Sequence, residues 1–393
     1  MRSSCTFEAD FQTPVRQTSH LEKLHLKALN SLVKEDMKTS VKLYDEILFD
    51  YPKDIFALNM SYFTSLYIGQ RDLCRNIAGR AASAYKKSDR FYGSVHGKLC
   101  FGYEEMNQFA EAEEAGRKAL EHTPNDIWTI HSIAHLKEET QKCNEGFKFL
   151  ENTQESWIGR NSLVHHVQWH QSLFAYQLGH FEQALTILED SILPACRKTK
   201  KSLAFADATA LLLRLEMEDV QGLDLQDHWR EVGNMYSEII DETSTFRLFF
   251  DFHALLGCLF GDQKSSATKL LDSLTAFTED CDKAYPENNQ GQILRGYGLD
   301  LFHGLKAFAE ENYEDAFRIL KPQRHEWMKS LTGSRAQLDI LNQVLITCAV
   351  RAKNKAWATQ LLNERLSTCG LISNDNEEPS LNQRLQIKIQ AMI

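Results

Sequence analysis

Paired amphipathic segments recur along this chain at intervals of about thirty-four residues, and this recurrence restricts the fold more than any other feature of the sequence. In the clearest unit, about residues 93–125, Asn107 and Gln108 separate two segments whose apolar side chains fall at helical spacing. Ala112 is small enough to let two helix backbones approach closely, and Pro124 ends the second segment. The unit therefore predicts a helical hairpin.

The same frame recurs in other parts of the chain. Three further units place small, aromatic or aliphatic residues at the equivalent positions: Ala28, Ser40, Tyr44 and Ile47, then Gly179, Phe181, Ala184 and Leu188, then Gly304, Ala307, Tyr313, Ala316 and Leu320. A fragment at 349–362 repeats the small-residue spacing. The pattern resembles the tetratricopeptide repeat. We therefore predict an all-α fold, an α-α superhelix of irregular tetratricopeptide-like helical hairpins.

The repeats extend over most of the 393 residues. Because repeat arrays grow by stacking one unit on the next, this length does not require several domains. We predict a polar, disordered tail at 1–20 and a single tetratricopeptide-like repeat domain at 21–393. Looser stretches at about 221–245, 278–296 and 370–381 are expected to be longer connections within that domain.

Charge and cysteine content bear on the partners and location of the chain. The formal net charge is −10 with no basic stripe, so we expect no nucleic-acid partner. No run approaches the eighteen or so apolar residues of a membrane span, so we expect no membrane partner. The nine cysteines are scattered singly without a Cys-x-x-Cys pair. They predict free thiols and a cytoplasmic location.

Four histidines form two pairs with the same spacing. His131 and His135 share one helical face with Glu138, and His166 and His170 repeat the four-residue spacing in the next hairpin. Such a pair can hold one Zn²⁺ or Fe²⁺ ion with both rings, and a nearby carboxylate can complete the shell or act as a base. The pattern leaves two alternatives. One is a metal site on the four histidines with Glu138 as candidate base, and the other is a structural polar network without a cofactor.

Other side chains are candidates for the same space. Trp128 and Trp169 are expected to pack in the groove or to form a platform for a ligand. Asp207 and Arg214 lie seven residues apart on one helical face and form either a buried ion pair or an anion clamp. The segment 249–253 supplies another carboxylate and imidazole. The candidate ligand-binding residues are therefore Trp128, His131, His135, Glu138, His166, Trp169, His170, Asp207, Arg214, Asp251 and His253.

The segment 332–339 has the pattern of a helix start. Ser334 can cap the helix, and Gln337, three residues later, can complete a capping box. The exposed amides of a helix start can also bind an anion, but the cap alone accounts for these residues.

Several segments together resemble the tetratricopeptide repeat protein 38 family. These segments are 126–138, 166–170, 179–185, 214–218, 251–253 and 333–339. The resemblance runs from about residue 22 to the end of the chain and implies the same helical repeat fold without an established activity. Lys137 stands where members often have a histidine, and Arg335 where a histidine or asparagine is usual. A further N-terminal helical region of the family has no counterpart here, which alters the expected edge of the groove.

Two functional hypotheses follow. In the first, the chain is a cytosolic binding or scaffold protein that holds a peptide or small molecule in a concave groove lined by His and Trp. In the alternative, it is a metal-dependent enzyme of the hydrolase or oxygenase type that uses the paired His-x-x-x-His helices. The first is favoured because such repeats mostly bind partners, and because the sequence has no Gly-rich phosphate loop or Gly-x-Ser-x-Gly motif.

Overall fold

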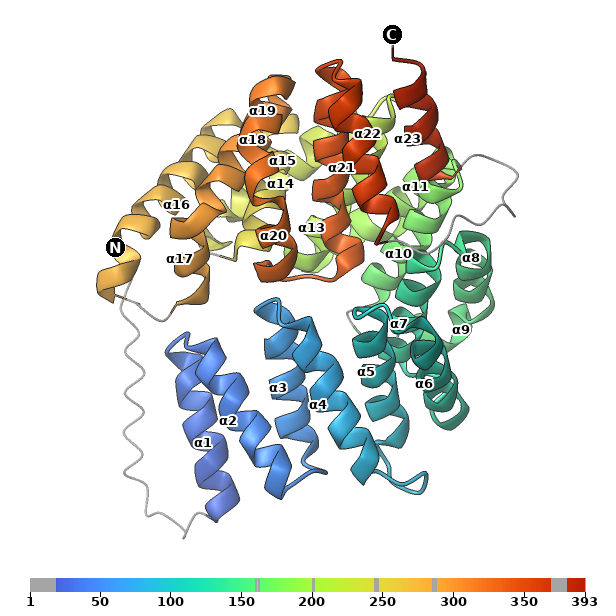
Figure 1. The fold of residues 1–393 in the computed structure, drawn as a ribbon, viewed down its shortest axis with the longest axis vertical. Helices are drawn as coiled ribbons and strands as arrows, with labels where there is room; N and C mark the ends of the chain where they lie inside the picture. Colours follow the sequence, from blue (N-terminus) through green and yellow to red (C-terminus); the bar gives the residue numbers. More distant parts are fainter. Residues whose placement is uncertain are drawn as a thin grey trace.

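The computed structural model describes residues 19–159, 161, 163–199, 202–243, 247–284, 288–368 and 380–392. Within these residues the chain is helical and has no β-strand, which confirms the predicted all-α fold (Figure 1). Residues 1–18 of the predicted tail lie outside this description. Residues 19 and 20 were assigned to that tail wrongly, because Ser19 forms a capping box with Glu22 and begins the first helix.

The helices follow one another with short connections (Figure 1). In chain order they are α1 (His20–Val33), α2 (Met37–Asp50), α3 (Ile55–Tyr67), α4 (Arg71–Ala84), α5 (Tyr92–Glu104), α6 (Phe109–His122), α7 (Ile127–Glu139), α8 (Cys143–Asn152), α9 (Gln154–Trp157), α10 (Val164–Gln177), α11 (Phe181–Ile187), η1 (Leu188–Ile192), α12 (Leu193–Thr199), α13 (Ser202–Glu218), α14 (Gln226–Thr243), α15 (Leu248–Phe260), α16 (Lys264–Ala284), α17 (Asn289–Ile293), η2 (Leu294–Gly298), α18 (Leu299–Ala309), α19 (Tyr313–Leu320), η3 (Lys321–Gln323), α20 (Arg324–Ser330), α21 (Arg335–Arg351), α22 (Lys355–Leu366) and α23 (Leu381–Gln390).

One turn geometry joins the two helices of eight hairpins in the described part of the chain. After α5, for example, Asn107 has a φ of 59°, and the backbone N–H of Gln108 donates to the carbonyl of Tyr103 over 2.9 Å. This hydrogen bond to the carbonyl five residues earlier is the Schellman motif. The residues with positive φ in the eight turns are Glu35, Gly69, Asn107, Gln141, Gly179, Asp262, Glu311 and Lys353. The repeated turn confirms the predicted superhelix of helical hairpins.

Small residues allow the paired helices to pack closely, as the repeat pattern requires. Ser40, Ala112, Ala184 and Ala316 are each fully buried. They occupy the equivalent positions of four hairpins, where a larger side chain would force the two backbones apart. The sequence frame therefore marks real packing positions in the fold.

Two looser stretches of the sequence were assigned wrongly, and the third, 370–381, lies mostly outside the described residues. Most of 278–296 belongs to α16, α17 and η2. Residues 221–245 were expected to be a connection, but most of them form α14 (Gln226–Thr243). Trp229, Val232 and Tyr236 lie on one face of this helix and are buried in the core. The other faces are polar, so the low overall hydrophobicity of the segment conceals a one-sided amphipathic helix.

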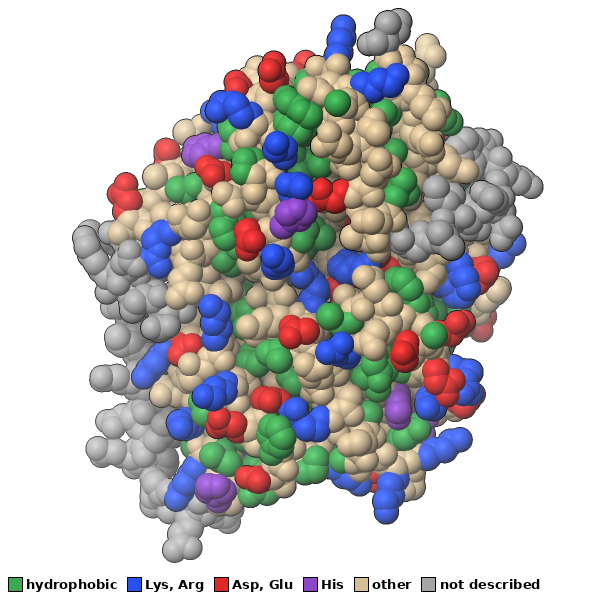
Figure 2. Space-filling model, viewed as in Figure 1, with side chains coloured by type: hydrophobic (Ala, Val, Ile, Leu, Met, Phe, Trp, Pro, Cys, Tyr) green, Lys and Arg blue, Asp and Glu red, His purple; other side chains and the backbone are tan. Residues whose placement is uncertain are grey.

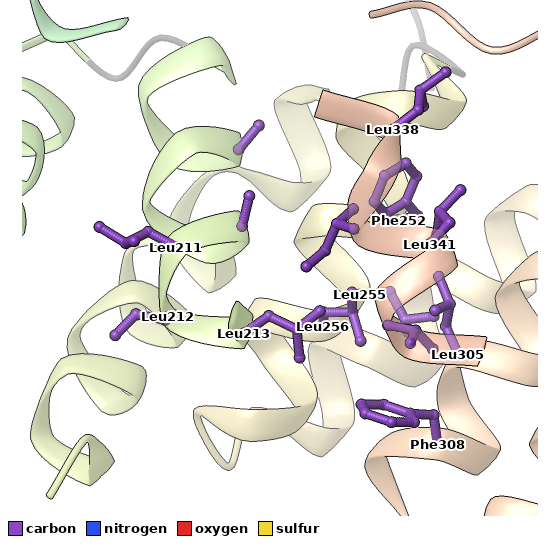
Figure 3. Close-up of a cluster of buried hydrophobic side chains, with 14 of the residues drawn as sticks. Leu211, Leu212, Leu213, Phe252, Leu255, Leu256, Leu305, Phe308, Leu338 and Leu341 are labelled. Atoms are coloured by element: carbon purple, nitrogen blue, oxygen red, sulfur yellow. The ribbon is translucent and has the colours of Figure 1, made fainter. Parts of the chain in front are cut away.

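The largest hydrophobic core lies in the C-terminal half of the chain, where helices from four hairpins meet (Figure 3). The labelled side chains come from α13 (Leu211, Leu212, Leu213), α15 (Phe252, Leu255, Leu256), α18 (Leu305, Phe308) and α21 (Leu338, Leu341). Burying each side chain of this size contributes about 1.5–3 kcal/mol. This core holds α13, α15 and α21 in fixed positions around the site described below.

The superhelix also brings distant parts of the sequence together. The N-terminal helices α1–α7 lie against the segment 288–342 (Figure 1), and we call this contact the seam. Across it, Arg71 of α4 donates to the carbonyls of Met328 (2.6 Å) and Gly333 (2.7 Å). A guanidinium bound to several carbonyls fixes both segments. The seam therefore creates sites that neither segment could form by itself.

Surface and thiol features complete the description. Lys and Arg side chains are interspersed with Asp and Glu over the face shown in Figure 2. None of the helices in the described ranges is long and apolar enough to cross a membrane. The cysteines whose side chains the structure describes are free and buried: Cys74, Cys100, Cys143, Cys196, Cys258 and Cys348.

Candidate metal centre

Helices α7 and α10 position the four histidines of the two sequence pairs. Each helix presents two rings four residues apart, His131 and His135 on α7, His166 and His170 on α10, so both pairs project toward the space between the helices. The four side chains are 0–4% exposed. The repeat pattern predicts these rings on the surface of a concave groove, whereas the structure buries them.

The four rings converge on one point. One nitrogen from each ring lies within 4.8 Å of the corresponding nitrogens of the other three. The Nε2 atoms of His131 and His135 are 3.0 Å apart, and the ring centroids of His135 and His170 are 4.3 Å apart. We call these four residues the histidine cluster. As a group, they could hold a metal ion.

Carboxylates from three helices surround the cluster on its outer side. Asp207 of α13 lies 2.9 Å from Nδ1 of His166, and Glu138 of α7 lies 3.2 Å from Nδ1 of His170. Because a carboxylate accepts hydrogen bonds, these Nδ1 atoms carry the hydrogens and the Nε2 atoms keep their lone pairs. This is the carboxylate–histidine arrangement that orients metal ligands. Glu104 of α5 lies farther away, 3.8 Å from Nδ1 of His135.

The cluster does not satisfy its own hydrogen-bonding groups. Nδ1 of His131, Nδ1 of His135 and Nε2 of His170 are buried without a hydrogen-bond partner. A buried polar atom left unsatisfied costs about 1–3 kcal/mol. A purely structural network should pair these nitrogens. The Nε2 atoms of His131 and His135 pair with each other over 3.0 Å, so one of them donates. A cation at the point where the rings converge would replace this hydrogen bond and satisfy Nε2 of His170.

Burial sets the protonation of the cluster. Desolvation, reinforced by the neighbouring rings, lowers the pKa of His131 and of His135 well below the usual range, and desolvation does the same for His170. These rings are therefore neutral at pH 7, which is the form that binds a metal. Burial also raises the pKa of Glu138 to about 7, although Arg214 opposes this shift.

The donor set and its spacing fit one divalent transition metal. Ligand nitrogens at about 2.0–2.1 Å from a tetrahedral Zn²⁺ lie about 3.3 Å from one another. Because the cluster nitrogens are at most 4.8 Å apart, the rings need to approach by no more than about 1.5 Å, which small side-chain rotations provide. A set of four imidazole ligands suits Zn, Fe, Cu or Ni.

A cavity of about 270 Å³ opens beside the cluster, and we call it the inner cavity. His131, His135 and His166 form part of its wall, while His170 lies behind them. The rest of the lining is mainly aromatic and aliphatic and consists of Phe63, Leu66, Tyr67, Phe101, Trp128, Leu163, Leu203, Phe249, Phe250, Thr332, Gly333, Ser334 and Gln337. An ion on the cluster would therefore face an apolar chamber.

The two tryptophans have different roles. Trp128 lines the inner cavity, and its ring centroid lies 5.0 Å from those of Phe63 and His131. Trp169 is fully buried and stacks on His166 at 5.1 Å, with the guanidinium of Arg214 5.6 Å from its ring. Trp128 is thus placed to touch a ligand, whereas Trp169 supports a histidine from behind.

Glu138 also lies on the outer side of the cluster. Its second oxygen accepts a hydrogen bond from Gln177 over 3.3 Å. It adjoins a small polar cavity of about 40 Å³, not the inner cavity. This position suits a group that orients His170 better than a base that reaches a substrate.

The Asp207 and Arg214 pairing expected from the sequence was wrong. Asp207 bonds to His166, as described above, and Arg214 donates to the carbonyls of Ala210 and Ala336, each over 3.0 Å. The two residues do not pair with each other, because His166 binds Asp207 and α21 supplies an acceptor for the guanidinium of Arg214. Arg214 thereby ties α13 to α21.

Asp251 and His253 of α15 do not line the inner cavity, although Phe249 and Phe250 of the same helix do. Nδ1 of His253 donates to the carbonyl of Phe249 over 2.7 Å, and its ring stacks on Phe252. Burial lowers the pKa of His253 to about 3 and raises that of Asp251 well above its usual range. Both residues are core groups beside the site.

The predicted helix start at 332–339 is confirmed. Ser334 and Gln337 form both bonds of a capping box at the start of α21. Arg335 crosses the seam, where its guanidinium contacts Glu139 and Asn107. The capping residues also face the inner cavity, so the cap forms part of the site wall.

Sequence reasoning missed the residues that reach the site from other hairpins. Glu104 follows no histidine spacing, and Phe63 and Tyr67 belong to a segment far from both histidine pairs. The i, i+4 spacing of the two aromatics on α3 was the one available signal, but it is common to packed helices. Phe63 and Tyr67 are seen to face the histidine cluster only in the folded structure, where both line the inner cavity.

A scan of the sequence against known protein families finds no family that matches.

Proposed function

We propose that this chain is a metalloprotein in which His131, His135, His166 and His170 hold one divalent transition metal, Zn²⁺ or Fe²⁺. We further propose that it is a metal-dependent enzyme, of the hydrolase or oxygenase type, acting on a small apolar molecule in the inner cavity. The observation that carries the proposal is the convergence of four buried imidazoles, several with an unpartnered nitrogen, on one point at the wall of an apolar chamber.

The surrounding residues support this assignment. Asp207 and Glu138 hold the rings of His166 and His170 with Nε2 facing inward. Their charges offset those of a dication in a buried place. A bound metal would supply Lewis acidity or oxygen chemistry at the cavity wall. The aromatic lining excludes bulk water and orients the substrate.

A cobalt titration tests the proposal. Co²⁺ bound by four imidazoles absorbs visible light, so the titration should saturate at about one ion per chain. The variants His131→Gln and His170→Gln should each weaken binding by at least about a hundredfold. His180→Gln is the matched control, because His180 is exposed and directly follows α10. Equal binding by all four proteins would refute the site.

The second candidate is the cytosolic binding scaffold. Its support is the size of two open hollows at the seam, about 570 Å³ and 590 Å³, which is enough for a drug-sized ligand or part of a peptide. A scaffold should bind its ligand equally well in the metal-free double variant His131→Gln, His170→Gln, and an enzyme should lose its activity there. Membership of the tetratricopeptide repeat protein 38 family, a cytoplasmic location and the lack of a nucleic-acid partner stay predictions.

A further inference from the structure

A second hollow adjoins the inner cavity, and we call it the outer groove. Its volume is about 590 Å³. It is lined by Leu32, Val33, Glu35, Met37, Asn59, Met60, Phe63, Thr64, Tyr67, Arg247, Asn288, Asn289 and Gln290. Phe63 and Tyr67 line both spaces. The two hollows therefore meet at these two side chains.

The same two elements form the walls of both spaces. On α3, Asn59 and Met60 face the outer groove, and Leu66, two turns farther along, faces the inner cavity. On the opposite wall, Arg247 belongs to the outer groove and Phe249 and Phe250 to the inner cavity. Both α3 and the start of α15 thus run from the outer groove toward the histidine cluster. The two hollows together are therefore elongated along these two elements.

Hydrogen bonds across the seam fix the opposite wall. The backbone N–H of Leu248 donates to Oε1 of Gln290 over 3.1 Å, which ties the start of α15 to α17. Asn288 bonds to Glu35 in the α1–α2 turn, and Lys38 donates to Gln292 over 3.3 Å. The outer groove is therefore held open between two fixed sides.

The chemistry of the lining changes along this direction. Val33 is 71% exposed and Phe63 40% exposed, and both belong to the seven exposed large apolar side chains of the described ranges. Farther in, Phe101, Trp128 and Leu163 line the wall. Exposed apolar side chains that continue into an aromatic chamber are typical of a binding surface for an apolar ligand. The polar groups gather at the outer rim.

We propose that the inner cavity and the outer groove form one channel for an elongated apolar molecule. One end of that molecule reaches the histidine cluster, and its body passes between Phe63 and Tyr67 to lie along Met60 and Val33. This inference names the substrate class of the proposed enzyme and rests on the proposed metal site. A compact substrate would need only the inner cavity, whereas an elongated substrate would also contact the outer groove.

A series of 1-alkylimidazoles tests the channel on the full chain loaded with Co²⁺. The imidazole head would bind the metal from the inner cavity as a further ligand and change its visible spectrum, and a tail that follows the proposed channel would pass Phe63 and Tyr67. From 1-methyl to 1-decylimidazole, each methylene that enters the outer groove should tighten binding about two- to fourfold. Binding that does not change with chain length would overturn the channel.

Variants at the outer groove separate this result from nonspecific apolar binding. Val33→Asp and Met60→Glu place a charge along the proposed path and should abolish most of the gain with chain length. Both should leave the binding of 1-methylimidazole unchanged, since they do not touch the cluster. Ile387→Asp, at a 55% exposed position of α23, is the control and should keep the full gain.

The outcomes distinguish the two proposals. No cobalt spectrum refutes the metal site. A cobalt spectrum that does not respond to 1-methylimidazole refutes access to the metal from the inner cavity, and with it the channel. A normal response to 1-methylimidazole with an unchanged chain-length gain in Val33→Asp and Met60→Glu refutes the channel and leaves the metal site standing. Loss of the gain in these two variants, with the gain kept in Ile387→Asp, supports the channel.

Discussion

Burying an imidazole removes two ring nitrogens from water, and each nitrogen then needs a partner within the protein. For His166 and His170, one nitrogen of each ring is satisfied by a carboxylate behind it. The remaining nitrogens face the other rings, which cannot all donate to one another. A metal ion resolves this conflict because it accepts every lone pair at once.

The outer carboxylates should matter for metal affinity more than for folding. We expect Asp207→Asn to weaken metal binding about 10- to 100-fold, because the amide can no longer fix the tautomer and orientation of His166 as a carboxylate does. Competition with a chelator of known affinity measures the change. Asp227→Asn is the control, since the side chain of Asp227 is 92% exposed. An unchanged affinity in Asp207→Asn would show that the carboxylate has no such role.

The pKa of His253 predicts a pH dependence of stability. Its pKa is about 3 in the folded state because of burial, against about 6.5 when unfolded. Only the unfolded chain takes up this proton as the pH falls below 6.5, so the fold loses stability there, by about 2 kcal/mol between pH 6.5 and 5. His253→Gln should lose about that much less than wild type in urea unfolding with a chelator present. Parallel pH profiles for the two proteins would contradict the assignment.

At the residue scale, the sequence predicts the histidine cluster because identical i, i+4 pairs in successive hairpins are rare and chemically specific. It does not predict that the rings are buried, because burial depends on α5, α13 and α21 packing around them. The roles of Glu138 and Arg214 were misjudged for the same reason. Their partners, His170 and the carbonyl of Ala336, come from elements distant in sequence.

At the element scale, the same Schellman turn joins the two helices of each of these hairpins. Two of the turns differ in the residue that takes the positive φ, which is Gly69 in one and Lys353 in the other. Gly69 has a φ of 76°, and a Cβ there would lie 2.7 Å from the carbonyl oxygen of Lys329. Gly69→Ala should therefore cost about 2 kcal/mol or more, from left-handed strain and from the clash across the seam. Lys353→Gly should change stability by about 1 kcal/mol or less. Urea unfolding compares them, and equal effects would contradict this reading.

The helices themselves were largely predictable. Small residues, turn residues and prolines at the repeat period identify hairpins because close helix packing demands them, and the capping boxes at Ser19 and Ser334 follow local rules. The sequence does not predict α14, because the segment is mostly polar. Its narrow apolar face becomes recognisable only when Trp229 packs against the core. Local rules predict helices well where each hairpin contains its own packing signal.

At the scale of the whole molecule, the seam decides where the site forms. Arg71 is nearly buried, pairs with Glu105 over 3.1 Å and donates to three carbonyls of the segment 328–333. Arg71→Ala removes the ion partner of that buried carboxylate, which keeps the backbone N–H of Arg335, and should destabilise the fold by about 3–5 kcal/mol. Arg75→Ala, which loses bonds to Asn76 and Gln108, should cost about 1 kcal/mol or less. Similar unfolding midpoints for the two variants would show that the seam contributes little.

Hydrogen exchange gives a second readout of the Arg71→Ala variant. If the seam opens, the amides at the start of α21 should exchange faster, while those of α13 and α15 in the main core should keep their protection. No feature of the sequence predicts the seam, because its contacts join residues roughly two hundred or more positions apart. This is the physical reason that the inner cavity and the outer groove were not foreseen.

The most direct measurement of the central claim is the metal content of the purified full chain. After loading with Zn²⁺ or Fe²⁺ and removal of free ions, elemental analysis should find about one ion per chain in wild type. It should find almost none in the double variant His131→Gln, His170→Gln. The wild type and the double variant should show the same helical circular dichroism. Wild-type protein that is fully folded yet retains neither metal would contradict the account.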